Sequence, residues 1–163
     1  MIFVTVGTHE QPFNRLIECI DSLVGEGKIK EEVFIQTGYS TYEPKFCKWK
    51  KMLPYQDMIN YVAEARIIIT HGGPSSFIMP LQIGKIPIVV PRQKQYGEHV
   101  NDHQVEFCRE VEKRFGNIIV VENMDSVEEI INRLKNKCDE AGKIQLNNEA
   151  FICKFEQLVK KLV

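Results

Sequence analysis

A short segment near the middle of the chain combines a buried strand, a glycine pair and a helix start in an order that suits phosphate binding. Ile67-Ile68-Ile69 are consecutive β-branched residues, which predicts a strand buried on both faces. His71-Gly72-Gly73 follows, and Pro74-Ser75-Ser76 suits the first turn of a helix. A helix N-terminus after a glycine turn presents free N–H groups and a partial positive charge to an anion. The alternative is an ordinary turn whose glycines only permit tight backbone geometry.

The four histidines all lie at or near the predicted carboxyl ends of strands, where ligands bind in parallel sheets. They are His9, His71, His99 and His103. His71 could donate to a diphosphate or a sugar hydroxyl, or it could only cap its own turn. His9 follows Gly7-Thr8 in the first loop, where it could be a phosphate donor, a catalytic group or a loop tether.

A metal site is a minority interpretation of the histidine spacing. His99 and His103 are four residues apart on a predicted helix, a spacing that can hold zinc. The order Glu98-His99-x-x-x-His103 differs from the HExxH motif, and the sequence offers no obvious third ligand. We therefore expect no bound metal.

Gln104 is an unusual residue for its position. It lies near the start of the helix after residue 98, on the apolar stripe, where a leucine would be expected. It either satisfies a buried backbone group or faces a ligand in the cleft, and we favour the ligand. Asn101 and Asp102 lie in the same turn and could contact sugar hydroxyls.

Predicted strands and helices alternate along the chain without repeats or low-complexity linkers. Strands are expected at 2–6, 33–35, 67–69, 87–91 and 118–121, with a possible short strand within 45–53, and helices at 13–24, 54–65, 74–83, 98–115, 126–134 and 149–163. This alternation predicts an α/β fold with a doubly wound, mainly parallel sheet, formed by a single domain over residues 1–163. The glycine turns and the loop after Val90 should converge at one edge of that sheet.

Composition excludes several classes of function. The chain has 163 residues and a formal net charge of −1, so charge does not favour a nucleic-acid partner. The one basic concentration, within 45–51, could be a solvated face or could lie near anionic lipid or a phosphorylated acceptor. No apolar run approaches the ~20 residues of a membrane-spanning helix, and the N-terminus lacks the features of a signal peptide. Five widely spaced cysteines without a CxxC motif indicate reduced thiols in a cytoplasmic protein.

Four ordered motifs together resemble a known domain. They are Val4-Thr5-Val6-Gly7-Thr8-His9, Thr70-His71-Gly72-Gly73-Pro74-Ser75-Ser76, Gly84-Lys85-Ile86-Pro87-Ile88-Val89-Val90-Pro91 and Asn101-Asp102-His103-Gln104. In order and spacing they resemble the C-terminal, donor-binding domain of GT-B glycosyltransferases of the family 28 type. Over roughly residues 1–135 the chain is similar to stand-alone small subunits of two-component enzymes, both the eukaryotic one that extends dolichol-linked sugars and its bacterial capsule and exopolysaccharide counterparts.

The resemblance implies a UDP-sugar donor site. Gly7, Thr8 and His9, with the turn from His71 through Ser76, would hold the diphosphate, and Gln104 with Asn101 or Asp102 would hold the donor sugar. His9 and then His71 are the residues to test first for a catalytic role. Such enzymes are generally metal-independent, because the helix N-terminus replaces the cation at the leaving diphosphate, and the expected reaction is an inverting hexosyl transfer.

One position departs from the family pattern. Family members usually carry a glutamate on the helix after the glycine turn, where it holds the ribose hydroxyls, and this chain has Met79 followed by Pro80. Glu98 is the candidate substitute for that contact.

The resemblance also implies a partner, because a complete GT-B enzyme has two such domains. The expected partner is a membrane-anchored subunit that binds a lipid-linked saccharide acceptor and recruits this chain to the inner face of the membrane. A helix over 149–163 is the candidate docking element, or else it packs on this domain's own core. Two other functions fit the same features: a non-catalytic enhancer of a separate transferase, and a nucleotide-sugar epimerase-like half.

Overall fold

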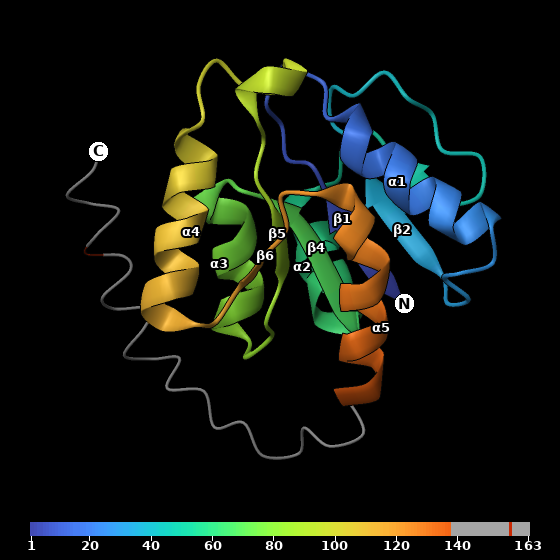
Figure 1. Cartoon of the computed structure of the whole chain (residues 1–163). Helices are drawn as coiled ribbons and strands as arrows, with labels where there is room; N and C mark the ends of the chain where they lie inside the picture. The colour runs from blue at the N-terminus through green and yellow to red at the C-terminus, as the bar shows by residue number, and fades with distance from the viewer. Residues whose placement is uncertain (138–156, 158–163) are drawn as a thin grey trace.

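The computed structural model describes residues 1–137 and residue 157, and within them it shows a parallel six-stranded sheet flanked by helices (Figure 1). The strands are β1 (Ile2–Thr5), β2 (Val33–Gln36), β3 (Lys48–Lys50), β4 (Ile67–His71), β5 (Ile88–Val90) and β6 (Ile119–Val120). The helices are α1 (Asn14–Gly25), α2 (Tyr55–Glu64), α3 (Pro74–Gln82), α4 (His103–Phe115) and α5 (Val127–Lys137), with short 3-10 helices η1 (Lys94–Tyr96) and η2 (Met124–Ser126).

The strand order is β3-β2-β1-β4-β5-β6, and every neighbouring pair is parallel. The chain runs outward from β1 to β3, then returns to β4 on the other side of β1 and continues to β6. This confirms the predicted doubly wound α/β sheet. The winding direction reverses between β1 and β4, and ligands bind in such sheets at the carboxyl ends of the strands beside the reversal point.

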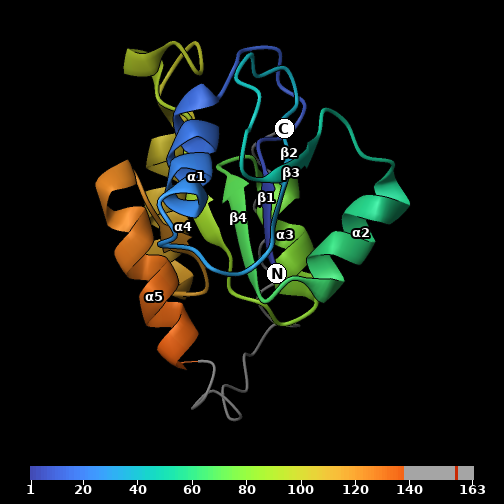
Figure 2. The same cartoon turned by 90° about the vertical axis from the view of Figure 1, so that its right-hand side faces the viewer.

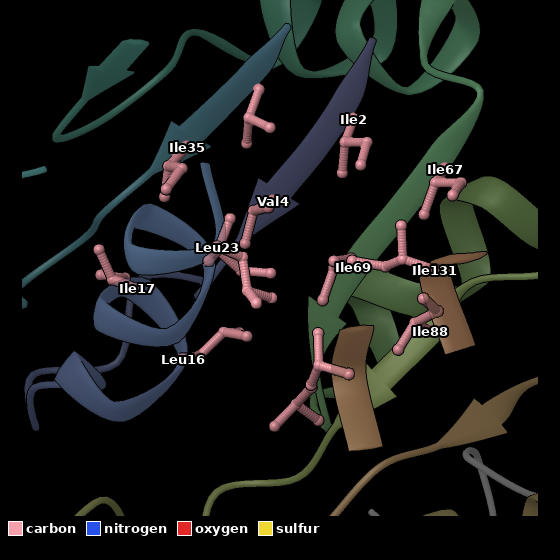
Figure 3. Close-up of a cluster of buried hydrophobic side chains, with 14 of the residues drawn as sticks. Ile2, Val4, Leu16, Ile17, Leu23, Ile35, Ile67, Ile69, Ile88 and Ile131 are labelled. Atoms are coloured by element: carbon pink, nitrogen blue, oxygen red, sulfur yellow. The ribbon is translucent and has the colours of Figure 1, made fainter. Parts of the chain in front are cut away.

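Alternate residues of the buried strands supply two apolar layers. Ile2, Val4, Ile35, Ile69 and Ile88 pack with α1 and α5 on one face of the sheet (Figure 3). Figure 2 shows α1 and α5 on one side of the sheet and α2 and α3 on the other. On that second side the apolar residues of α2 pack on β1 and β4, whereas those of α3 and α4 pack on β5. Because both faces are covered, β1, β2, β4 and β5 are buried throughout, as their continuous apolar runs predict.

The helix expected from residue 98 begins five residues later, at His103. The carboxylate of Glu98 accepts hydrogen bonds from the Gln93 N–H and from Arg15, and these contacts hold residue 98 in the loop after η1. The Asp102 carboxylate accepts the N–H of Lys94 and fastens the same loop to the helix start. These polar contacts hold residues 98 and 102 in the loop before the helix.

A buried carboxylate anchors the segment between β2 and β3, which the residue pattern left undefined. Asp21 of α1 accepts the N–H groups of Lys45, Phe46 and Cys47 at 2.9–3.0 Å and the hydroxyl of Tyr42 at 2.8 Å. Burial acts to raise the pKa of Asp21, but these hydrogen bonds outweigh it and hold the pKa below its ordinary value. The anchored segment ends in β3, which lies within the expected range of 45–53.

Each helix within residues 1–137 is too short or too polar to span a membrane. The proposed docking helix at 149–163 lies outside the described residues, apart from residue 157.

Candidate functional site

The carboxyl ends of β1 and β4 bring two predicted site segments together. The loop from Gly7 follows β1, and His71 ends β4 directly before α3. β1 and β4 pair in register from Ile2 and Ile67 to Thr5 and Thr70, so their carboxyl ends are adjacent. The loops after β1 and β5 rise at this same end of the sheet (Figure 1). The predicted convergence at one sheet edge is therefore what the structure shows.

The His71 imidazole is buried between these two segments with both ring nitrogens hydrogen-bonded. Its Nδ1 accepts the N–H of Gly73 at 3.1 Å, and its Nε2 lies 2.8 Å from Oγ of Ser76. Because Nδ1 is the acceptor, Nε2 carries the proton and donates it to the serine oxygen. Burial, together with the nearby charges of Arg92, His9 and His99, lowers the pKa of His71 to about 3. His71 is therefore neutral at physiological pH and braces the turn.

Two glycines make room for this ring. A Cβ atom on Gly7 would lie 2.3 Å from Nε2 of His71, and a Cβ on Gly73 would lie 2.2 Å from its Cε1. Gly7 also has a φ of +74°, in the left-handed region that favours glycine. At these two positions glycine is thus required by close packing against His71, in addition to any exposure of the backbone to a ligand.

The start of α3 keeps fewer free amides than a glycine pair suggests. The Gly73 N–H is used by His71, and the Ser76 N–H donates to the Gly73 carbonyl. Ser75 is exposed at the second helical position, where an N–H has no intrahelical acceptor. The Ser76 hydroxyl accepts from His71, which leaves its own proton to donate outward. The groups that can meet an anion here are the Ser75 amide, the two serine hydroxyls and the positive end of the helix dipole.

The loop after β1 is held by a closed set of hydrogen bonds. The Gly7 N–H donates to Oγ1 of Thr5, and the Thr5 hydroxyl donates to Oε1 of Gln36. Nε2 of Gln36 then donates to the Gly7 carbonyl at 3.1 Å. This ring of contacts fixes Gly7, and the exposed Thr8 that follows it is free to meet a ligand.

The structure pairs His9 with His99, and leaves His103 apart from them. The His9 and His99 rings stack with centroids 4.9 Å apart, and Nε2 of His9 lies 2.9 Å from Oε1 of Gln11. Burial and the neighbouring His9 lower the pKa of His99. His103 is exposed beside Glu106. Among the described residues, no group of three or more His, Cys, Asp or Glu side chains is placed to hold a metal ion.

Arg92 is the central residue that the sequence pattern did not single out. It is 1% exposed, and its guanidinium donates to the carbonyls of Val6, Gln11 and Glu98 at 2.7–3.2 Å. It also lies over the Phe13 ring, 4.8 Å from the centroid. Burial lowers its pKa to about 10, so it keeps its charge at neutral pH. Arg92 thereby ties the loop after β1 to the loop after β5.

Gln104 satisfies a backbone group, which was the alternative to the ligand contact expected for it. Its Oε1 accepts the Arg92 N–H at 3.1 Å, and a Cβ on Gly72 would lie 3.0 Å from the same oxygen. Gln104 is half-buried, and its Nε2 amide has no hydrogen-bond partner within residues 1–137. The ligand role therefore stays a prediction, now confined to that nitrogen.

The other predicted donor-binding residues of this loop mostly hold the loop itself. Asn101 Oδ1 accepts the N–H of His103, and Asp102 Oδ1 accepts that of Lys94. Glu98 is 2% exposed and both its carboxylate oxygens are engaged. A ribose contact by Glu98 would require it to leave its ion pair. Met79, at the position of the usual family glutamate, is half-buried and packs against the apolar cluster between α2 and the sheet.

Acidification tests the buried neutral state of His71. Its pKa is about 3 when folded against 6.5 for an ordinary histidine, so the unfolded chain binds the proton more readily. The stability that the folded chain keeps by holding His71 neutral is therefore complete above pH 6.5, and it is lost as the pH falls from 6.5 toward 3. From pH 7 to pH 5 the free energy of unfolding should fall by about 2 kcal/mol through this residue.

His71→Asn should remove that pH dependence, because the amide oxygen can still accept the Gly73 N–H but does not titrate. Urea unfolding at pH 7, 6 and 5 measures it. His103→Asn is the matched control, because it removes an exposed histidine and leaves the contacts of His71 in place. If the free energy of unfolding falls equally with pH in wild type and in His71→Asn, His71 is not held neutral by the fold.

Comparison with solved structures supports the fold. One match is the crystal structure of the glycosyltransferase SnogD from Streptomyces nogalater, with a TM-score of 0.51 and 18% sequence identity. The alignment covers 93% of this chain and 42% of SnogD, so the chain spans less than half the length of that protein. A comparison with curated proteins gives no match. The family model of the glycosyltransferase family 28 C-terminal domain matches residues 1–163. The chain therefore belongs to the glycosyltransferase family 28 C-terminal domain family.

Proposed function

We propose that this chain is the donor-binding subunit of a glycosyltransferase that moves a hexose from a UDP-sugar to a polyprenyl-diphosphate-linked saccharide. The observation that carries the proposal is the start of α3, where Ser75 and Ser76 lie beside the loop from Gly7 at the reversal point of the sheet. Family membership supports a nucleotide-sugar donor. The finer assignments, to UDP, to a lipid-linked acceptor and to capsule or exopolysaccharide synthesis, come from the sequence resemblance.

In the proposed reaction, an acceptor hydroxyl attacks the anomeric carbon while the bond from that carbon to the UDP oxygen breaks. Negative charge grows on the departing diphosphate, and the start of α3 would stabilise it through the Ser75 amide, the serine hydroxyls and the helix dipole. His71 would act through Ser76, since its Nε2 proton polarises that hydroxyl. Charge stabilisation of this kind needs no metal ion.

His9 is the proposed group for proton transfer or leaving-group contact in this chain. It stands in the loop after β1, stacked on His99 and hydrogen-bonded to Gln11. Burial lowers the pKa of the stacked partner His99, and the nearby His9 and Arg92 add to that effect. A neutral imidazole is the form that can accept a proton from an acceptor hydroxyl.

The second half of the enzyme would come from a membrane-anchored partner that binds the acceptor. This partner is an expectation of the sequence resemblance to two-component enzymes. The partner would also bring this chain to the inner face of the membrane.

Titration of the full chain with UDP tests the donor site. Ser76→Ala removes a hydroxyl that would donate to the diphosphate, and such a charged hydrogen bond contributes on the order of 1.5–3 kcal/mol, or roughly tenfold or more in Kd. Ser22→Ala, at an exposed serine of α1, is the control and should bind UDP as wild type does. UDP affinity that is equal in all three proteins would place the diphosphate elsewhere.

A transfer assay with the partner separates catalysis from enhancement. Mixing the chain with the partner should give transfer from a UDP-sugar, and His9→Gln should lower kcat while complex formation stays unchanged. Unaltered transfer in both His9→Gln and Ser76→Ala would favour a non-catalytic enhancing subunit.

A further inference from the structure

A concave site lies beside α1, beyond the carboxyl ends of β5 and β6. It is a cavity of about 460 Å³ between the first turn of α1, the loop after β5 and the loop after β6. Its volume falls within the range of ligand pockets, roughly 300–1,000 Å³. Its lining includes Arg15, Gln93, Gln95, Tyr96, Asn123 and Met124.

This cavity, here called the α1 pocket, is separate from the start of α3. The fully buried Phe13 ring contacts both guanidinium groups, with its centroid 5.5 Å from that of Arg15 and 4.8 Å from that of Arg92. Arg15 faces the α1 pocket, whereas Arg92 donates to the Val6 carbonyl beside the loop after β1. A molecule in the α1 pocket is therefore not the diphosphate at α3.

The charged groups of the α1 pocket are already paired. Arg15 donates to both carboxylate oxygens of Glu98 at 2.8 and 3.0 Å, and also to the backbone carbonyls of Pro91 and Glu122. The Glu122 carboxylate accepts two hydrogen bonds from Arg109 at 2.6 Å. Because each charge is matched by a bidentate partner, the pocket offers no free charge to a phosphate, a carboxylate or a cation.

Tyr96 presents an accessible aromatic ring at the α1 pocket. The Arg15 guanidinium lies 4.7 Å from the ring centroid, and the residue is 55% exposed. One face of the ring is thus covered by the cation while much of the side chain stays accessible. An accessible aromatic face beside polar groups suits a ligand that has both a C–H face and hydroxyls.

Amide groups lie ready to bind hydroxyls. Gln93 Nε2 donates to the Glu122 carbonyl at 2.9 Å, and Gln95 Nε2 donates to Oε1 of Gln93 at 2.6 Å. This chain of hydrogen bonds orients both side-chain amides. Asn123 Oδ1 accepts the N–H of Asp125. Within residues 1–137, Oε1 of Gln95 and Nδ2 of Asn123 have no hydrogen-bond partner. The pocket therefore presents one oriented acceptor and one oriented donor.

We propose that the α1 pocket binds an uncharged sugar ring, with the ring stacked on Tyr96 and its hydroxyls bonded to Gln95 and Asn123. Paired charges exclude an ionic ligand, and the combination of an aromatic face, amides and the apolar Met124 matches a pyranose. The assignment of this bound sugar as the acceptor saccharide rests on the proposed function, because the donor sugar would stay with the diphosphate at α3. Glu98 joins the two sites, since its carboxylate binds Arg15 and its carbonyl binds Arg92.

Nuclear magnetic resonance titration of the full chain tests this proposal. The probes are the methyl glycosides of glucose, galactose and N-acetylglucosamine, lactose, and methyl glucuronide as the charged comparison. At least one neutral glycoside should shift the amide signals of residues 95, 96 and 123, and saturating UDP should not displace it. Tyr96→Ala should weaken this binding roughly tenfold, and Gln95→Ala several-fold.

Tyr55→Ala is the matched control, because Tyr55 is a 72% exposed tyrosine at the start of α2, outside the α1 pocket. It should bind glycosides as wild type does, and Tyr96→Ala should bind UDP as wild type does. Absence of glycoside shifts in a chain that binds UDP would overturn the α1 pocket and leave the proposed function intact. Glycoside binding without UDP binding would instead contradict the proposed donor site. Tighter binding of the glucuronide than of every neutral glycoside would also contradict an uncharged ligand.

Discussion

Arg92→Met is expected to lower the free energy of unfolding by about 3–5 kcal/mol. Methionine keeps much of the side-chain volume, but it cannot donate to the carbonyls of Val6, Gln11 and Glu98. These acceptors would lose a charged donor that is 1% exposed, and buried acceptors without partners are costly. Urea unfolding measures the loss.

Ligand binding should weaken together with the stability, because Arg92 ties the loop after β1 to the loop after β5. UDP affinity of the folded variant should fall. Arg109→Met is the matched control, since Arg109 is exposed on α4 and its partner Glu122 is accessible. That control should stay within about 0.5–1 kcal/mol of wild type. Similar stability losses in the two variants would show that the buried contacts of Arg92 are not what holds the loops.

Gly7→Ala is expected to cost about 3 kcal/mol of unfolding free energy and most of the UDP affinity. Two causes add: a left-handed backbone with a φ of +74° costs an L-residue roughly 1–2 kcal/mol, and overpacking costs roughly 1–3 kcal/mol. The added Cβ would lie 2.3 Å from Nε2 of His71, so the imidazole or the loop must move. Calorimetric unfolding and UDP titration report the two effects.

Gly97→Ala separates the two causes. Gly97 has a φ of +69°, but an added Cβ there would meet nothing within 4 Å. The variant should show the backbone cost alone, about 1–2 kcal/mol. Combining Gly7→Ala with His71→Ala should recover part of the loss, because the ring that the new methyl group strikes is gone. A double variant that is no better than the sum of its single changes would rule out the clash.

The residue pattern was enough for the fold. Ile67-Ile68-Ile69 predicted a doubly buried strand, and the glycine pair with Pro74 predicted the helix that follows; both are present. Such features are local, because side-chain branching, proline geometry and apolar period act within a few residues. The alternation of these elements then left a doubly wound parallel sheet as the natural arrangement, with its ligand edge at the carboxyl ends of the strands.

The pattern was a weaker guide to what each polar side chain does. It placed His71 at the site, but the pairing of both ring nitrogens depends on how the turn brings Gly73 and Ser76 back onto the ring. The resemblance made Glu98 a candidate for the ribose contact, and only the folded chain shows that its carboxylate pairs with Arg15, 83 residues away. The pattern passed over Arg92, whose partners Val6 and Gln11 lie 86 and 81 residues distant.

The physical reason for this division is the range of the forces. Backbone conformation and apolar burial follow from neighbours in the chain, so the sequence alone determined the strands, the helices and the edge at which they converge. A hydrogen bond or an ion pair depends on distance and angle between groups that only the closed sheet brings together. Tertiary structure therefore decided that His71 pairs with Gly73 and Ser76, that Arg92 ties the loop after β1 to the loop after β5, and that the α1 pocket exists.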